Sequence, residues 1–253
     1  MLALCVSFDT RVKSHLMNAR IGLLIPSSNT SVEPEFYRAL PPEVTLHTAR
    51  LFLSHISEET IAAMLAEMES QGKLLATADV DVIMLGAVSP GFLKGSDYDC
   101  QLAARIAAAT GKRASTTATA LLESLQHLNI TRIAIGAPYD KVVSEIASRF
   151  LQANGIEVVG TQELGLTENL DVGRLPPESA YDMGLRLDSA NGDKAQAIVF
   201  AGTNWRTMAI TQQLEAQIGK PVISTTAAAL WSALRIVGWQ GTLVGQGQLL
   251  NNV

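Results

Sequence analysis

The chain has 253 residues, of which 47% are apolar and 17% charged, and its net charge at pH 7 is -5. This composition predicts a folded globular protein with a large core and excludes wholesale disorder. The acidic balance and the scattered Lys and Arg residues exclude a basic nucleic-acid or membrane surface, so we expect neither partner. No apolar stretch approaches the roughly 20 residues of a transmembrane helix, and residues 1–6 are too short for a signal sequence, which predicts a cytoplasmic protein.

Short aliphatic runs alternate with longer helical patterns, which is typical of βαβ units around a parallel sheet. The runs predict strands at residues 20–25, 44–49, 80–85, 130–136, 156–160, 195–200 and 221–224. The patterns between them predict helices at residues 32–39, 57–76, 97–109, 118–127, 139–154, 177–190, 206–218 and 227–237. Residues 1–19 fit neither pattern and are expected to form an N-terminal extension.

Three pairs of similar segments occur in the same order in the two parts of the chain. The pairs are 111–122 with 219–230, 21–26 with 133–138, and 82–87 with 198–203. Chance similarity between aliphatic strands explains any one pair but explains three ordered pairs poorly. We therefore expect an α/β fold of two pseudo-symmetric parallel-sheet halves with the site in the cleft between them. Residues 20–117 plus 219–253 form the first predicted half, and residues 118–218 form the second.

The segments that directly follow the predicted strands share a small, polar character. In open α/β sheets, ligands bind beyond the carboxyl ends of the strands, so these segments are the candidate site. They supply hydroxyl, amide and backbone N–H donors without Arg or Lys, which suits a small carboxylate. The same residue types also favour helix N-caps, which is the alternative explanation for any single segment. The segments are residues 26–30, 86–89, 137–139, 201–204 and 224–226.

Few other residues in the sequence indicate specific chemistry. Tyr139 follows a predicted strand and Pro138, so it is the best titratable candidate in these segments, as a ligand-facing phenol or as a core ring. No Walker A, G-x-G-x-x-G, G-x-S-x-G or H-E-x-x-H motif occurs, so no nucleotide cofactor is indicated. The cysteines and histidines are dispersed without metal-ligand spacing, and we expect no metal site. They are Cys5, Cys100, His15, His47, His55 and His127.

At these residues the chain resembles the maleate cis-trans isomerase and arylmalonate decarboxylase branch of the aspartate/glutamate racemase superfamily. The likeness covers roughly residues 20–240. It rests on the segments 26–30, 86–95, 137–139, 166–170, 175–178 and 203–207. The resemblance implies a cofactor-free site between two halves and a small carboxylate or dicarboxylate as ligand. It also implies a homo-oligomer, because members of this superfamily often form dimers or tetramers.

The resemblance also implies roles for individual residues. Asn29, Tyr139 and Asn169 are expected to contact substrate carboxylates. Further hydrogen-bond donors, from backbone and side chains, are expected in the segments after the third predicted strand and after the strand at 195–200, and in the motif that contains Asn29. These additional residues are Ser28, Val88, Ser89, Thr203 and Asn204.

The chain departs from the family pattern at the two positions that matter most for catalysis. Isomerases and racemases of the superfamily typically use two cysteines that face each other across the substrate, because a thiol can act as nucleophile, base or acid near neutral pH. The two matching positions here are Ala87 and Gly202. Decarboxylases of the branch keep only the second cysteine, and Gly202 removes that one as well. Cys100 is expected about three helical turns beyond Ala87, too far to replace it.

Two functions are therefore open. The first is an enzyme that keeps the carboxylate site and performs proton transfer, elimination or decarboxylation without thiols, with Tyr139 as the catalytic residue. The second is a catalytically inactive carboxylate-binding or regulatory protein. We favour the enzyme, because a pocket with many polar groups is costly to keep unless a ligand uses them.

Overall fold

The computed structural model describes residues 19–253, and the expected N-terminal extension falls outside the described residues except for Ala19. The structure contains two four-stranded parallel sheets. The first has the order β2-β1-β3-β4, and the second has the order β6-β5-β7-β8. Their bounds are β1 Ala19–Pro26, β2 Val44–Leu51, β3 Val82–Leu85, β4 Arg113–Thr116, β5 Arg132–Tyr139, β6 Glu157–Leu166, β7 Ala197–Phe200 and β8 Val222–Ser224. The predicted α/β class of two similar parallel-sheet halves is confirmed.

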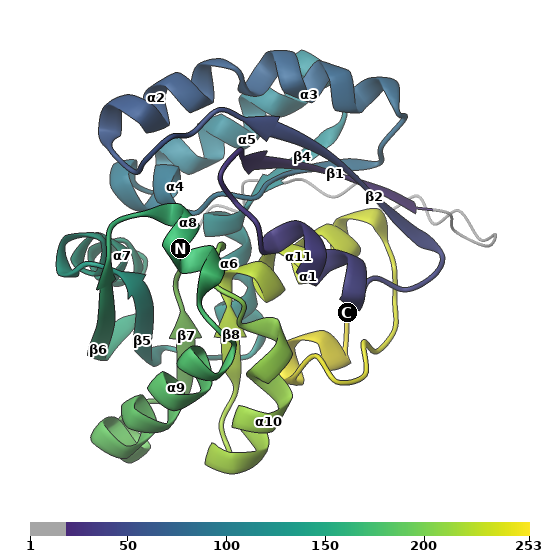
Figure 1. The fold of residues 1–253 in the computed structure, drawn as a ribbon. Coiled ribbons are helices and arrows are strands. Elements are labelled where there is room, and N and C mark those ends of the chain that lie inside the picture. Colours follow the sequence, from purple (N-terminus) through teal and green to yellow (C-terminus); the bar gives the residue numbers. More distant parts are fainter. Residues whose placement is uncertain (1–18) are drawn as a thin grey trace.

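Helices cover both faces of each sheet (Figure 1). Those associated with the first sheet are α1 Val32–Ala39, α2 Glu58–Ala66, α3 Met68–Thr77, α4 Ser89–Lys94, α5 Ser96–Thr110 and α6 Thr117–His127. The later ones are α7 Lys141–Ala153, α8 Asn169–Arg174, α9 Glu178–Asn191, α10 Met208–Ile218 and α11 Thr225–Val237, with short 3-10 helices η1 Gly192–Lys194 and η2 Gln248–Asn251. None of the helices in this part of the chain is long and apolar enough to cross a membrane.

The side chains of the strands alternate between two packing layers. Ile21, Leu23 and Ile25 of β1 point into a central core that also contains residues of the second sheet and of α6 and α11. Leu24 points the other way, into a core with α2, α3 and α5. This division follows from the two-residue period of a strand. Because both faces are buried, the strands are continuous aliphatic runs rather than alternating ones.

The two sheets exchange helices at their boundary. The strand β8 pairs with β7 and so belongs to the second sheet. The helix that follows it, α11, packs against α6 and contacts strands of the first sheet. The expected halves, 20–117 plus 219–253 and 118–218, stay a prediction, with β8 placed by its pairing beside the strands of the second half.

Several local predictions were wrong. The strand β4 was missed, and the helix predicted at 57–76 is two helices that meet at Glu67, the C-cap of α2 and N-cap of α3. The helices α4 and α8 were also missed, because six residues are too few to show a helical period. Tyr139 is the last residue of β5 instead of the first of a helix, since α7 begins only after its N-cap Asp140.

Candidate functional site

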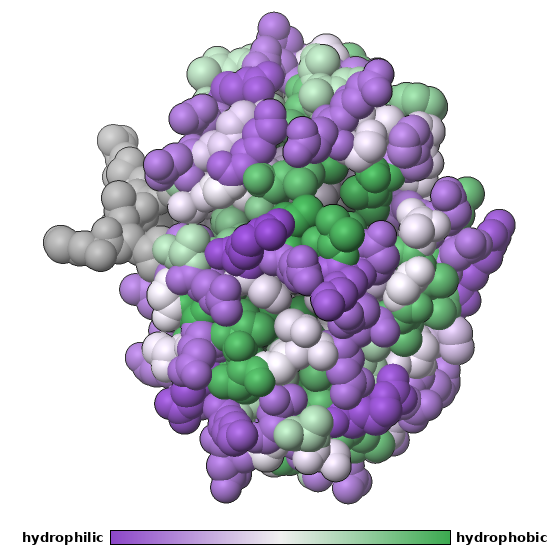
Figure 2. Space-filling model, turned by 90° about the vertical axis from the view of Figure 1, so that its left-hand side faces the viewer, coloured by the Kyte–Doolittle hydropathy of each residue, from purple (hydrophilic) through white to green (hydrophobic). Residues whose placement is uncertain are grey.

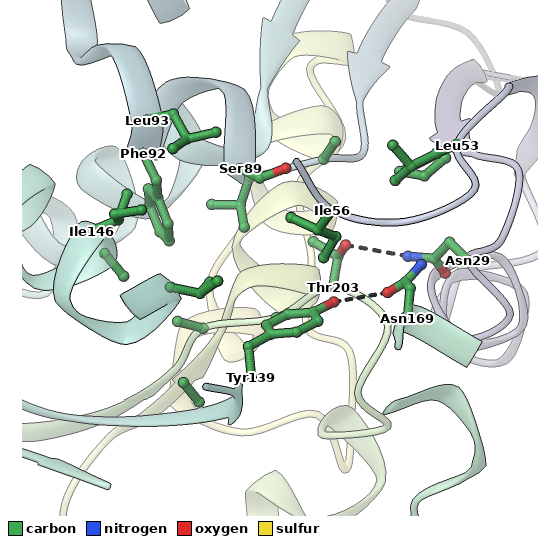
Figure 3. A pocket seen from close by; sticks show the side chains of 18 residues that line it. Asn29, Leu53, Ile56, Ser89, Phe92, Leu93, Tyr139, Ile146, Asn169 and Thr203 are labelled. Atoms are coloured by element: carbon green, nitrogen blue, oxygen red, sulfur yellow. Dashed lines mark hydrogen bonds between the residues drawn. The ribbon is translucent and has the colours of Figure 1, made fainter. Parts of the chain in front are cut away.

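A cavity of about 710 Å³, including the part that opens to solvent, lies where the carboxyl ends of strands from both sheets meet. This is the position at which open α/β sheets bind ligands. Its walls come from the ends of β1 and β5, from the segments that follow β1, β2, β3 and β7, and from α4, α7 and α8 (Figure 3). The lining residues are Pro26, Asn29, Leu53, Ile56, Ala87, Val88, Ser89, Phe92, Leu93, Ala137, Tyr139, Val143, Ile146, Ala147, Asn169, Ala201, Gly202 and Thr203.

Asn29 and Thr203 bring the two halves together at the polar end of this cavity. The side-chain oxygen of Asn29 accepts hydrogen bonds from the backbone N–H groups of Ser31 and Val32, both at 3.0 Å, so Asn29 also stabilises the start of α1. Its Nδ2 donates to Thr203 Oγ1 at 3.2 Å. One N–H of Asn29 and the hydroxyl hydrogen of Thr203 are therefore left to donate to a ligand.

Tyr139 and Asn169 form a second polar pair that faces the first (Figure 3). The Tyr139 hydroxyl donates to Asn169 Oδ1 at 2.8 Å, and Asn169 Nδ2 donates to Ser28 Oγ at 2.9 Å. Burial raises the pKa of the Tyr139 phenol well above its usual value, because a buried phenolate would lose its hydration. At neutral pH Tyr139 is thus a neutral hydrogen-bond donor.

Val88 and Ser89 line the cavity at the start of α4. The first N–H groups of a helix have no acceptor within the helix, so this segment offers donors from its backbone. Ser89 adds a half-buried hydroxyl. The loop on the opposite side is held in place by Thr225, whose Oγ1 accepts from the backbone N–H of Gly202 at 3.3 Å.

Ser28 and Asn204, two predicted ligand contacts, are not among the lining residues. Asn204 is fully buried, and its Oδ1 accepts from the Thr30 N–H at 2.7 Å while its Nδ2 donates to the Asn169 carbonyl at 2.6 Å. The amide of Asn204 thus cross-links loops of the two halves. Ser28 reaches the cavity only through Asn169. The structure brings the other predicted residues together around one space.

Ala87 and Gly202, the two positions that the resemblance matches to the family's cysteines, both line the cavity, but they differ in the room around them. The Cβ of Ala87 is already part of the wall. A Cβ added at Gly202 would lie 2.9 Å from both Cδ and Cγ of Pro138. Real side chains essentially never show such a contact, so a larger residue at 202 requires Pro138 to move. Cys100 lies in α5 and is not among the lining residues.

Most of the cavity wall is apolar, which the sequence analysis did not predict. Phe92 packs against Phe150 with ring centroids 5.0 Å apart, and aliphatic side chains from α4, α7 and the segment after β2 surround it. The apolar residues of this wall are Leu53, Ile56, Phe92, Leu93, Val143 and Ile146. Two features of the sequence could have indicated these residues. They are the apolar residues in the segment after the second strand and the apolar face of the helix after Tyr139.

Three large apolar side chains are exposed at positions next to lining residues in the chain. Phe52, Val142 and Leu170 are large apolar side chains with 64%, 63% and 48% of their surface exposed, and each adjoins a lining residue in the chain. Figure 2 shows apolar residues gathered near the centre of the face that carries α7 and α8, with hydrophilic residues around them.

Charged groups are absent from the lining of the cavity. Of the lining residues, all within the described chain, none is Asp, Glu, Lys, Arg, His or Cys, and Tyr139 is the titratable one. Within residues 19–253, no three His, Cys, Asp or Glu side chains are placed to hold a metal ion. An anion in this cavity would be held by neutral donors alone.

The amino-acid sequence is similar to known enzymes over nearly its whole length. The profile of the arylmalonate decarboxylase family matches residues 21–250. The chain is 30% identical over 244 residues to the maleate isomerase of Pseudomonas putida, covering 92% of this chain and 97% of that protein. It is 25% identical over 218 residues to the arylmalonate decarboxylase of Bordetella bronchiseptica, covering 86% of this chain and 90% of that protein.

The fold is shared with solved structures of the same enzymes. A cysteine-to-alanine variant of the maleate isomerase from Pseudomonas putida S16, solved with maleate, superposes with a TM-score of 0.86 at 27% identity, covering 93% of this chain and 98% of that one. A serine variant of the Nocardia farcinica maleate cis-trans isomerase, which carries a covalently bound succinylcysteine intermediate, gives 0.84 at 26% identity, covering 92% and 98%. These relatives are isomerases and a decarboxylase, and the chain belongs to the arylmalonate decarboxylase family of enzymes.

Proposed function

We propose that the protein is a cofactor-independent enzyme that decarboxylates a small malonate-type acid bearing an apolar substituent. The observation that carries the proposal is the composition of the cavity. Neutral donors from Asn29, Tyr139, Asn169 and Thr203 lie at one end, an apolar wall forms the other, and the described lining residues include no thiol, imidazole, carboxylate or amine.

Of the reactions that relatives perform, decarboxylation requires the fewest catalytic groups from the protein. A relative from Nocardia farcinica forms a succinylcysteine intermediate, and the matching positions here, Ala87 and Gly202, offer no nucleophile. Racemisation and elimination require a base to remove a proton, and the cavity has none that is charged near neutral pH. Loss of CO2 requires no base. It is favoured when the departing carboxylate faces an apolar wall and the retained one faces fixed donors.

The proposed reaction follows from these two walls. The bond from the α carbon to one carboxylate breaks, CO2 leaves, and the electron pair is delocalised into the retained carboxylate as an enediolate. Thr203 and the start of α4 donate to the developing charge. The Tyr139 hydroxyl, whose single hydrogen is donated to Asn169 in the structure, turns to the same oxygen when the substrate is bound. A water molecule then gives its proton to the α carbon, and the hydroxide combines with CO2 to form bicarbonate. Tyr139 acts as a hydrogen-bond donor and not as an acid, because its raised pKa makes proton release costly.

The test is an incubation of the purified protein in D2O with phenylmalonate, butylmalonate, maleate, aspartate and glutamate, followed by proton NMR. We expect both malonates to be converted to the monoacid with deuterium at the α carbon. We expect the other three acids to remain unchanged. Conversion of maleate to fumarate, or exchange at the α carbon of either amino acid without loss of CO2, would replace this proposal with isomerase or racemase chemistry.

A second candidate is a carboxylate-binding or regulatory protein without catalysis. Ala87 and Gly202 favour it, since neither family cysteine position can act as an acid. Line broadening and saturation transfer to the acids in the same tube, with no conversion of any of them, would support this candidate against the first.

A further inference from the structure

A second cavity of about 250 Å³, including its open part, lies under α2 next to the first. Its lining residues are Glu58, Ile61, Ala62, Leu65, Pro90, Leu93, Lys94 and Tyr98. Leu93 is the one residue common to the lining of both cavities. A single side chain on α4 therefore forms a shared wall between them, and Figure 3 places it beside Phe92 at the edge of the first cavity.

The inner part of the second cavity is apolar, and its charged residues lie at the surface. Ile61, Leu65 and Pro90 are buried, whereas Glu58 and Lys94 are exposed. Lys94 Nζ lies 5.0 Å from the centroid of the Tyr98 ring, which holds its charge over the ring. The inner space between Ile61, Leu65 and Pro90 thus suits an apolar group.

Leu93 itself is only partly buried and packs against the apolar cluster that includes Ile61 and Leu65. It belongs to α4, the helix that also carries Ser89 and Phe92 into the first cavity. A ligand whose carboxylate is held at the polar end and whose substituent lies along the apolar wall would extend towards Leu93.

We propose that Leu93 is a specificity-determining residue that sets the greatest length of the apolar substituent the site accepts. This inference rests on the proposed function, because it takes the carboxylate of the acid to lie at the polar end. With leucine at 93, the substituent stops at this side chain. Without it, the substituent continues into the second cavity between Ile61, Leu65 and Pro90.

The experiment measures, by calorimetry, the dissociation constants of the saturated monoacids that alkylmalonates would yield, from propanoate to decanoate, because these acids carry the same alkyl chains and are not turned over. Each methylene that leaves water tightens binding about fourfold. In the wild-type protein we expect this gain with each carbon until the chain reaches Leu93, and none beyond it. Leu93→Ala should extend the gain to longer chains, so that decanoate binds at least about tenfold more tightly to this variant than to the wild type. Leu93→Phe should end the gain at a shorter chain.

Leu74→Ala is the matched control, because Leu74 is 62% exposed on α3 and lines neither cavity. It should reproduce the wild-type dependence on chain length. Thermal unfolding identifies any variant that does not fold, and either Leu93 variant alone decides the question. If the acids bind and their affinity depends on chain length in the same way in the wild type and in both Leu93 variants, the proposed role of Leu93 is wrong. The proposed function is then unaffected. Failure of every acid to bind the wild type overturns both.

Discussion

Tyr139 is the residue whose predicted role changes most once its surroundings are known. The sequence suggested a titrating catalytic group, but the phenol is buried, donates to Asn169, and has a pKa well above its ordinary value. Its proposed role in decarboxylation is to turn this hydrogen from Asn169 to the charge that develops on the retained carboxylate.

Tyr139→Phe should therefore lower turnover of phenylmalonate by about 10- to 100-fold, the loss expected for one hydrogen bond to a charged group. Initial rates across pH 6–9 check this. No dependence on a phenol pKa should appear in the wild type over this range. Tyr37→Phe is the control, since the Tyr37 hydroxyl donates to the Leu46 carbonyl and Tyr37 does not line the cavity. Equal rates for the Tyr139 variant and the wild type would exclude this role.

Ala87 and Gly202 should differ in their tolerance of a larger side chain. Gly202→Ala and Gly202→Cys both force Pro138 to move, and we expect each to lower the free energy of unfolding by about 1–3 kcal/mol. Ala87→Cys adds one atom towards the cavity and should change the free energy of unfolding by less than about 1 kcal/mol. Urea unfolding curves measure both. A Gly202→Cys variant with the same free energy of unfolding as the wild type would show that Pro138 can move without destabilising the fold.

Glu35 predicts a dependence of stability on pH. This carboxyl is buried on α1, accepts a hydrogen bond from the Met208 N–H at 2.9 Å, and has its pKa raised to about 7 by burial. The folded state therefore holds a proton that the unfolded state releases near pH 4.5. The stabilisation is complete below pH 4.5 and is lost as the pH rises towards 7, by about 3 kcal/mol in total.

Glu35→Gln should remove this pH dependence. The free energy of unfolding of the variant should therefore rise relative to that of the wild type between pH 5 and pH 8. Denaturation curves at a series of pH values measure the effect. Glu59→Gln, at an exposed position on α2, serves as the control and should keep the wild-type slope. A Glu35 variant with the same slope as the wild type would mean that this carboxyl is ionised at no cost.

At the scale of elements, long periodic segments were predictable and short ones were not. The helix at 32–39 has the predicted bounds, and the strands at the centres of both sheets were found because buried parallel strands are aliphatic runs. β4 was missed because Ser115 and Thr116 interrupt the aliphatic pattern. The repeat held the missing information, since residues 113–116 align with the strand predicted at 221–224.

The polar part of the site was predictable in kind, and the apolar part was not. Asn29, Ser89 and Thr203 follow strands, so the general rule for parallel sheets located them. Leu53, Ile56 and Ile146 come from segments whose apolar residues look the same in a core as in a cavity. Asn204 was predicted as a ligand contact, whereas its contacts are to the loops around it.

These loops give a prediction at the same scale. Asn204 joins the β1–α1 loop, the start of α8 and the β7–α10 loop through buried hydrogen bonds. Asn204→Ala should lower the free energy of unfolding by about 3 kcal/mol, because the Thr30 N–H and the Asn169 carbonyl lose their partner. Asn252→Ala, at an exposed position, is the control for the same truncation. A loss below about 0.5 kcal/mol would mean that these loops hold together without it.

At the scale of the molecule, the similarity of the two sheets explains where the site lies. Two sheets of the same strand order place the carboxyl ends of β1 and β3 opposite those of β5 and β7, and each half supplies part of the polar end. Asn29 with Thr203 and Ser28 with Asn169 are bonds between the halves. The cytoplasmic location and the homo-oligomer stay predictions.

The central claim is that this cavity removes a carboxylate without a thiol. The most direct measurement uses phenylmalonate labelled with carbon-13 in both carboxylates and follows the label by carbon NMR. We expect labelled bicarbonate and phenylacetate in equal amounts, formed at a rate proportional to the protein concentration and strongly reduced in Tyr139→Phe. Saturable binding of phenylmalonate with all of the label retained in the malonate would contradict it.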